Sequence, residues 1–199
     1  MIAVWFIVLM VNGISGFDTK TAEAQTTSRE YKVKVAYLYN FSRYMTWPSS
    51  AFEKADAPFT IGVMGTDPMG DSLNSLTQKK RAHGRKVEIK HFTTPDEFTP
   101  CHILFISLLN SPNVHSEILR KTTGTPVLLV GEVDGFARQG AGASFFVDGD
   151  GTVGFRINID SLTEKQIMVD AKLLRLAEVV RNEPATNRTG LLNRGASRK

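Results

Sequence analysis

The residues with the clearest potential for chemistry are glycines that end or follow a short apolar stretch in the first third of the chain. Gly62, Gly65 and Gly70 lie where phosphate-binding loops follow a strand. Their spacing is not G-x-G-x-x-G and no Walker-type lysine follows, so glycine at a tight turn explains them more simply. Because small ligands bind at the carboxyl ends of strands in open α/β sheets, we predict that any ligand pocket is formed by Gly65, Asp67 and Ser107.

The residues that usually bind metals lack the spacing of ligands. The histidines are His83, His91, His102 and His115. Cys101 and His102 are adjacent, so in a strand their side chains point to opposite faces. Asp148 and Asp150 alternate with glycines, but the 12-residue loop with a terminal glutamate that binds Ca²⁺ is absent. We therefore predict neither a metal ion nor a cofactor.

Patterns of nucleophilic catalysis are also missing from the sequence. There is no G-x-S-x-G nucleophile elbow and no Cys/His/Asn pattern. A response-regulator receiver needs an aspartate as phosphoacceptor at the end of its third strand, where Ser107 stands. The residues thus favour a binding protein over an enzyme. A hydrolase with an unfamiliar constellation and a small-ligand carrier stay as alternatives.

The composition and the beginning of the chain limit the class of protein to which it can belong. A length of 199 residues with 42% hydrophobic residues suits one globular domain. Residues 2–11 form an apolar run that is too short to span a bilayer. Ala22-Glu23-Ala24 then matches the small-residue pattern of a cleavage site, so we predict a signal peptide over residues 1–24 and export. A buried N-terminal helix is the alternative.

The end of the chain, residues 182–199, is predicted to be a disordered basic tail. Its cations are Arg188, Arg194, Arg198 and Lys199, interleaved with small polar residues that cannot bury apolar surface. A nucleic-acid arm is conceivable from this composition. Exported proteins rarely meet nucleic acid, however, so we predict a solvated tail and no nucleic-acid partner.

Residues 29–48 predict a main core helix, because they contain all four tyrosines of the chain together with Phe41 and Trp47. At 100° per residue one stripe forms, made of Tyr31, Val35, Leu38, Ser42 and Met45, with Phe41 beside it. Ser28 can cap the start of the helix, and Trp47 before Pro48 can end it. Tyr39, Asn40 and Arg43 lie away from the stripe and are free to face outward. Trp47 is expected either to close the core or to lie half-exposed at an interface.

The remaining pattern predicts an α/β fold with three layers, namely a mostly parallel sheet with helices on both faces. Strands are expected at residues 59–65, 103–107 and 127–130, with a strand nearer the sheet edge around Val87 and Ile89. Residues 143–147 and 152–157 flank Asp148-Gly149-Asp150-Gly151, which predicts an antiparallel hairpin that finishes the sheet. A last helix is expected after its N-cap Asp170, with a buried stripe of Leu173, Leu176, Ala177 and Val180. These elements form a single domain over residues 28–181.

Six motifs in the same order resemble the YfiR-like (DUF4154; YfiR/HmsC) family of bacterial periplasmic proteins. They are Y-K-V-K-x-A-Y-L-Y-N-F-x-x-Y-x-x-W-P from Tyr31, P-F-T-I-G-V-M-G from Pro58, C-H-I-L-F-I-S from Cys101, P-V-L with G-E from Pro126, F-R-I-N from Phe155 and K-L-L-R-L-A from Lys172. The resemblance covers nearly all of the predicted mature chain. Many members have cysteine pairs, whereas Cys101 is alone here, so no internal disulfide can form.

The resemblance implies a periplasmic regulatory protein that represses an inner-membrane diguanylate cyclase by binding its periplasmic sensor region. The output would be control of cyclic-di-GMP and biofilm formation. A sensor kinase is the other membrane partner that the family implies, and a homodimer is left open. The protein is expected to be peripheral to the membrane only through its partner. The partner-binding surface is expected at Tyr39, Asn40, Arg43 and Trp47. The alternative function is a periplasmic small-ligand-binding protein that feeds a sensor kinase or a transporter.

Overall fold

The computed structural model describes residues 19–184. Residues 1–18 and 185–199, which hold most of the predicted signal peptide and of the predicted tail, lie outside the described residues. The helices are α1 (Thr19–Tyr44), α2 (Gly70–Lys79), α3 (Pro112–Lys121), α4 (Ile159–Glu164) and α5 (Ala171–Leu174), with the 3₁₀ turns η1 (Ser49–Ala51) and η2 (Pro95–Glu97). None of the helices in the described part of the chain is both long and apolar enough to cross a membrane.

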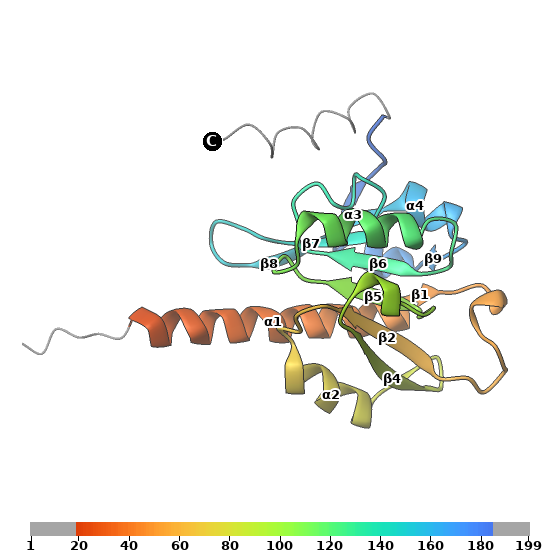
Figure 1. Ribbon diagram of the computed structural model, residues 1–199, viewed down its shortest axis with the longest axis horizontal. Coiled ribbons are helices and arrows are strands. Elements are labelled where there is room, and N and C mark those ends of the chain that lie inside the picture. Colours follow the sequence, from red (N-terminus) through yellow and green to blue (C-terminus); the bar gives the residue numbers. More distant parts are fainter. Residues whose placement is uncertain (1–18, 185–199) are drawn as a thin grey trace, which may run out of the picture.

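The centre of the fold is a mostly parallel sheet of eight strands (Figure 1). Its strands are β2 (Phe59–Met64), β3 (Arg81–Ala82), β4 (Arg85–Phe92), β5 (Ile103–Ile106), β6 (Leu128–Gly131), β7 (Ala143–Val147), β8 (Val153–Asn158) and β10 (Glu178–Val180). Their order is β10-β8-β7-β6-β5-β2-β4-β3. The five strands from β7 to β4 in this order run parallel. A separate antiparallel pair joins β1 (Met45–Thr46) to β9 (Met168–Val169).

Both faces of the sheet are covered, as predicted from the alternation of strands and helices. In β5, Ile103 and Phe105 belong to one hydrophobic cluster, which α1, α2, α4 and α5 complete. Leu104 and Ile106 belong to a second cluster on the other face, which Ile118 of α3 completes. Strand residues that are buried on both faces require such a cover, so the predicted three-layer α/β architecture is confirmed.

The predicted stripe is buried: its five residues and Phe41 beside them are all at most 8% exposed, and all lie on helix α1 except Met45, the first residue of β1. The helix starts earlier than expected, at Thr19, so Ser28 lies inside it and the predicted N-cap is wrong. Residues 19–28 contain neither glycine nor proline to stop the helix from extending. Figure 1 shows this first part reaching well beyond the body of the domain. The helix ends at Tyr44, before Trp47, because the next two residues pair with β9.

The C-terminal part differs from the sequence prediction in one element. Asp170 does cap a helix, since its side chain accepts a hydrogen bond from the amide of Lys172, but that helix has only four residues. The chain then forms β10, which runs parallel to β8, so the β7–β8 hairpin is present but does not form the sheet edge. Leu176 is 70% exposed rather than part of a buried stripe. β-Branched residues 179 and 180 favour the strand, and Val180 is buried there.

Candidate functional site

The carboxyl edge of the parallel strands contains a buried ion pair that joins α1 to the end of β6. The ammonium of Lys34 on α1 contacts the carboxylates of Glu30 and Glu132. The side chains of Lys34 and Glu132 are each only 2% exposed, whereas that of Glu30 is 26% exposed. Ions are rarely buried to this degree unless they are paired. The Lys34–Glu132 pair is therefore a specific internal contact and not a chance surface pairing.

The second carboxylate oxygen of Glu132 extends this network to two more segments. Glu132 Oε2 accepts hydrogen bonds from the hydroxyl of Tyr31 at 3.3 Å and from the amide of Leu108 at 3.0 Å. Burial, followed by the negative charge of Glu132, raises the pKa of Tyr31, so its hydroxyl stays protonated and can donate. One carboxylate thus ties α1, the loop after β5 and the end of β6 together.

The residues of the predicted ligand pocket do meet at this same edge. Gly65 follows β2 with φ of +69°, a conformation that favours glycine. A Cβ atom at Gly65 would lie 1.8 Å from Oδ1 of Asn110, so the two residues are in close contact. Ser107 is fully buried, and its hydroxyl donates to the carbonyl of Thr66 at 3.3 Å. Asn110 in turn donates to the carbonyl of Ser107 at 3.3 Å.

Asp67, the third residue of the predicted pocket, serves the turn into α2. Its Oδ1 accepts hydrogen bonds from the amides of Met69 at 2.8 Å and Gly70 at 3.1 Å. Its Oδ2 lies 3.8 Å from Nδ1 of His91. The polar atoms of Gly65, Asp67 and Ser107 are thus engaged with neighbouring residues, and their role in binding a ligand stays a prediction.

Exposed apolar side chains also gather at the carboxyl edge. Leu108 and Leu109, in the loop after β5, are 55% and 60% exposed, and Val147 at the end of β7 is 46% exposed. Val33 on α1, next to Lys34, is 37% exposed. One helical turn further on, the hydroxyl of Tyr37 donates to the carbonyl of residue 153, which pairs with residue 147. We call Val33, Leu108, Leu109 and Val147 the carboxyl-edge face.

Three of the predicted partner-binding residues lie on the outer side of α1. Tyr39 and Asn40 are half-buried and Arg43 is exposed. The hydroxyl of Tyr39 donates to the carbonyl of Arg81 on β3 at 3.3 Å. The guanidinium of Arg43 lies 5.7 Å from the centre of the Tyr39 ring and 5.5 Å from that of Tyr44. Tyr39 is therefore partly occupied by packing against β3, while Arg43 is available to a partner.

Trp47, the fourth predicted partner-binding residue, belongs to the core. It is only 6% exposed, its Nε1 donates to the carbonyl of His102 at 3.1 Å, and its ring meets Phe59 edge to face at 4.8 Å. Of the two roles expected from the sequence, the structure shows the core role. The expectation that Trp47 is half-exposed at an interface is wrong, because the chain turns inward after β1 and places the indole beside β2 and β5.

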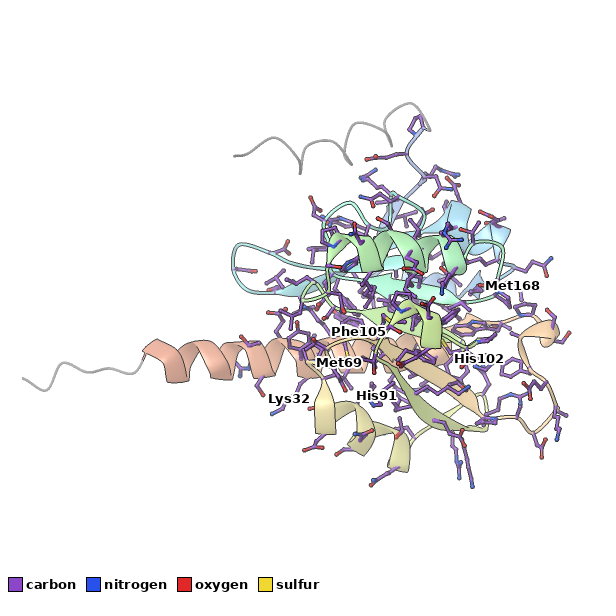
Figure 2. The ribbon with its side chains drawn as sticks, viewed as in Figure 1. Lys32, Met69, His91, His102, Phe105 and Met168 are labelled. Carbon is purple, nitrogen blue, oxygen red and sulfur yellow. The ribbon has the colours of Figure 1, made fainter. Side chains whose placement is uncertain are left out.

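A hollow of about 470 Å³ lies at the opposite, amino edge of the sheet, beside His102. Figure 2 shows His102 on the other side of the body from Lys32 and Met69. The His102 ring lies between Phe52 at 4.4 Å and Phe59 at 4.6 Å, and its Nδ1 accepts from the amide of Thr60 at 2.9 Å. Burial is the main cause that lowers the pKa of His102 to about 4, so the ring is neutral at physiological pH.

Cys101 lines the same hollow but is chemically quiet. It is 7% exposed, and burial raises the pKa of its thiol to about 12, so the nucleophilic thiolate is scarcely populated. Across residues 19–184, no group of three or more His, Cys, Asp or Glu side chains is placed to hold a metal ion. The hollow is thus lined by apolar and neutral groups together with Glu53, Glu88 and Lys90.

Sequence reasoning overlooked Lys34 and Glu132, although one signal was available. Lys34 lies three residues after Tyr31 and four before Leu38, which places it on the apolar stripe of the helix. A lysine at such a position requires a buried acid as its partner. Glu132 directly follows a fully buried strand, but its pairing with a residue 98 positions away could not be predicted from spacing.

The fold and the site together define a three-layer α/β domain with a buried ionic network and an apolar face at the same edge. The comparison with known families is specific: the family described as DUF4154, YfiR/HmsC-like, matches residues 31–178. The chain therefore belongs to the YfiR/HmsC-like family. This result confirms the resemblance on which the functional expectations depend.

Two solved structures show only a weak similarity to the chain. The ABC domain in complex with L-Trp from Streptococcus pneumonia is 13% identical, with a TM-score of 0.45. A conserved domain protein from Vibrio cholerae is 14% identical, with a TM-score of 0.41. In both cases the match covers 61% of this chain and 54% of the other chain. No curated protein matches the sequence significantly.

Proposed function

We propose that this protein is an exported regulator that represses an inner-membrane diguanylate cyclase by binding its periplasmic sensor region. The observation that carries the proposal is the family match over residues 31–178. The site agrees with a binding role, because its buried charges hold segments together and the side chains of the carboxyl-edge face are exposed and apolar. Repression then requires only that the protein bind the inactive sensor conformation better than the active one. A differential affinity of about 5.5 kcal/mol would move a two-state sensor from almost fully active to almost fully inactive.

The carboxyl-edge face is the surface that we assign to the sensor region. Protein interfaces have a core that is depleted in charge and rich in apolar groups, and four of the seven large apolar side chains that are exposed in the described residues lie on this face. The outer side of α1, with Tyr39, Asn40 and Arg43, is the second candidate surface. It offers a tyrosine and an arginine, which are frequent at interaction hot spots.

The proposal is tested in cells that report cyclic-di-GMP. Deletion of the gene should raise the cyclic-di-GMP level, and reintroducing the wild-type gene should lower it again. Leu108→Asp with Leu109→Asp should abolish this repression, because two carboxylates would enter the apolar interface. Met168→Asp with Leu176→Asp is the matched control, since these side chains are 67% and 70% exposed and lie outside the face. Tyr39→Ala with Arg43→Ala tests the second surface.

Each outcome of this experiment assigns or removes a role. Normal export and abundance must accompany any loss of repression, and N-terminal sequencing of the envelope fraction should find Gln25 or a near neighbour. If the deletion leaves cyclic-di-GMP unchanged whichever membrane cyclase is present, the repressor function is refuted. If both double variants repress normally, neither surface binds the sensor.

The hollow at the amino edge supports a second candidate function, a small-ligand-binding protein that acts through a sensor kinase or a transporter. Its volume of about 470 Å³ lies within the usual range for ligand pockets of about 300–1,000 Å³. A thermal-shift screen with small metabolites tests this role. A stabilising compound should lose its effect when the hollow is filled by Thr60→Phe, whereas a screen without any stabilising compound would count against it.

A further inference from the structure

The most strongly charged part of the surface is the edge of the sheet formed by β3 and β4. Residues 80–91 contain five lysines or arginines and one acid, which gives a net charge of +4 with neutral histidines. The whole chain also has a net charge of +4, so the remainder of the chain is balanced. The imbalance is therefore concentrated in 12 consecutive residues rather than spread over the molecule.

The fold exposes most of these cations together. Arg81 and Lys86 are direct cross-strand neighbours, so their side chains extend from the same face of the β3–β4 pair. Lys80, Arg81, Lys86 and Lys90 are all exposed. Arg43 of α1 lies near Lys80 at the same end of the sheet, because its guanidinium is beside the Tyr39 ring, which the Lys80 ammonium also approaches at 5.9 Å. We call Arg43, Lys80, Arg81, Lys86 and Lys90 the basic edge.

The cations of the basic edge have no ion-pair partner among residues 19–184. Elsewhere in the described chain, Lys34, Lys121, Arg156 and Arg181 contact a carboxylate, whereas the exposed Lys32, Arg120 and Lys172 are dispersed over three helices and have no such contact among the described residues. The only acid among residues 80–91, Glu88, stands between Lys86 and Lys90 along β4. Arg85 is excluded from the edge because its guanidinium is engaged, 3.9 Å from the Phe52 ring and bonded to the carbonyl of Ala57.

The basic edge also lacks the apolar core that a protein interface needs. Every exposed large apolar side chain of the described chain lies outside residues 80–91. The cations are spread along one end of the sheet, where Figure 1 shows β4 at the margin of the domain, and of the five only Lys90 lines the hollow beside His102. A group of exposed cations without carboxylate partners and without an apolar anchor fits an extended anionic surface better than a shaped protein partner.

We propose that the basic edge binds the anionic headgroups of a phospholipid membrane. The biological setting of this inference rests on the proposed function, which places the protein beside an inner-membrane partner. Each Lys or Arg near an anionic bilayer contributes about five-fold to the partition coefficient, and the attraction decays within a Debye length. Five such cations give reversible binding that depends strongly on salt and orients the domain on the membrane.

The test is co-sedimentation of the exported protein with vesicles of phosphatidylcholine alone or with about one third phosphatidylglycerol. We expect binding only to the anionic vesicles, and we expect it to weaken as NaCl is raised from 50 to 300 mM. Lys80→Gln with Arg81→Gln and Lys86→Gln should lower the partition coefficient about 100-fold. The matched control replaces Lys32, Arg120 and Lys172, which are also exposed, by Gln, so both variants have the same net charge.

Comparing these two variants separates the contribution of the basic edge to vesicle binding from that of the other cations. The wild type and both variants share the same C-terminal cations, so these cannot cause a difference in binding. Equal binding by the two variants, or no binding of wild type to anionic vesicles, would overturn the proposal. Displacement by inorganic phosphate but not by chloride at equal ionic strength would show a free-phosphate site instead. If the basic-edge variant no longer binds the purified sensor region in solution, and neither it nor the wild type binds vesicles, the basic edge binds protein and not lipid. Failure with vesicles while repression persists would leave the proposed function intact.

Discussion

The buried Lys34–Glu132 pair should have an asymmetric effect on stability when it is broken. Lys34→Met leaves the Glu132 carboxylate, 2% exposed, with only two hydrogen bonds from neutral groups. Removing one partner of a buried ion pair typically costs about 3–5 kcal/mol. Glu132→Gln should cost less, about 1–3 kcal/mol, because Lys34 keeps its contact with Glu30 and the glutamine oxygen can still accept from the amide of Leu108.

The assay is urea denaturation at pH 7, which gives the free energy of unfolding for the wild type, both single variants and the double variant. The double variant should be more stable than the sum of the two losses predicts, by roughly 1–3 kcal/mol, since no unpaired charge remains buried. Lys32→Met is the control. It removes a lysine from the exposed side of the same helix and should change stability by no more than about 0.5 kcal/mol.

Two results would refute this reasoning. A Lys34→Met variant as stable as the Lys32→Met control would show that the ammonium of Lys34 is not buried against Glu132. Strictly additive losses in the double variant would show that the two charges do not interact. The slope of the unfolding free energy with urea must stay unchanged for these comparisons, because a changed slope means a changed denatured or native ensemble.

Three further perturbations follow from the structure. The pKa of His102 is lowered from 6.5 to about 4. The contribution of the neutral ring to the free energy of unfolding should therefore be complete above about pH 6.5 and should fall by about 3 kcal/mol as the pH is lowered to 4. His102→Asn keeps an acceptor for the amide of Thr60 and should flatten this pH dependence in urea denaturation. Trp47→Ala should cost about 3–5 kcal/mol because the indole is buried, and a melting temperature like that of wild type would exclude a core role. Gly62→Ala should cost about 1–3 kcal/mol, because the new Cβ would lie 2.8 Å from the Phe92 ring, and an unchanged unfolding midpoint would show that the ring can move away.

The layers of the fold were predictable because the spacing of apolar residues along a helix or strand indicates which of its faces are buried. Ile103 to Ile106 is apolar without interruption, and the structure covers it on both faces. The start of α1 was not predictable from capping, because Ser28 is a good N-cap residue but residues 19–27 contain no glycine or proline that would stop a helix from extending. The end of the described chain differs from the prediction for a similar reason: Leu173, Leu176 and Val180 fit a helical stripe, yet pairing with β8 stabilises a strand. Tertiary pairing overrides local propensity at short elements.

The candidate site was less predictable than the fold, since it depends on contacts between distant segments. Sequence spacing correctly brought Gly65, Asp67 and Ser107 to one edge, because parallel strands end together. It could not show that Asn110 occupies the space above Gly65. The basic edge was visible in the sequence as a run of cations, but its exposure depends on the β3–β4 pairing, which spacing alone does not fix.

Helix α1 is the element that relates the two proposed surfaces to each other. Val33 contributes to the carboxyl-edge face and Arg43 to the basic edge, and ten residues of helix separate them by about 15 Å along the axis. The helix is held at both positions, by the buried Lys34–Glu132 contact and by the bond from Tyr39 to β3. A domain that is oriented on a membrane through its basic edge would therefore present the carboxyl-edge face at a fixed distance from the bilayer. This arrangement favours binding to the sensor region of a membrane protein, because it reduces the orientations that must be searched.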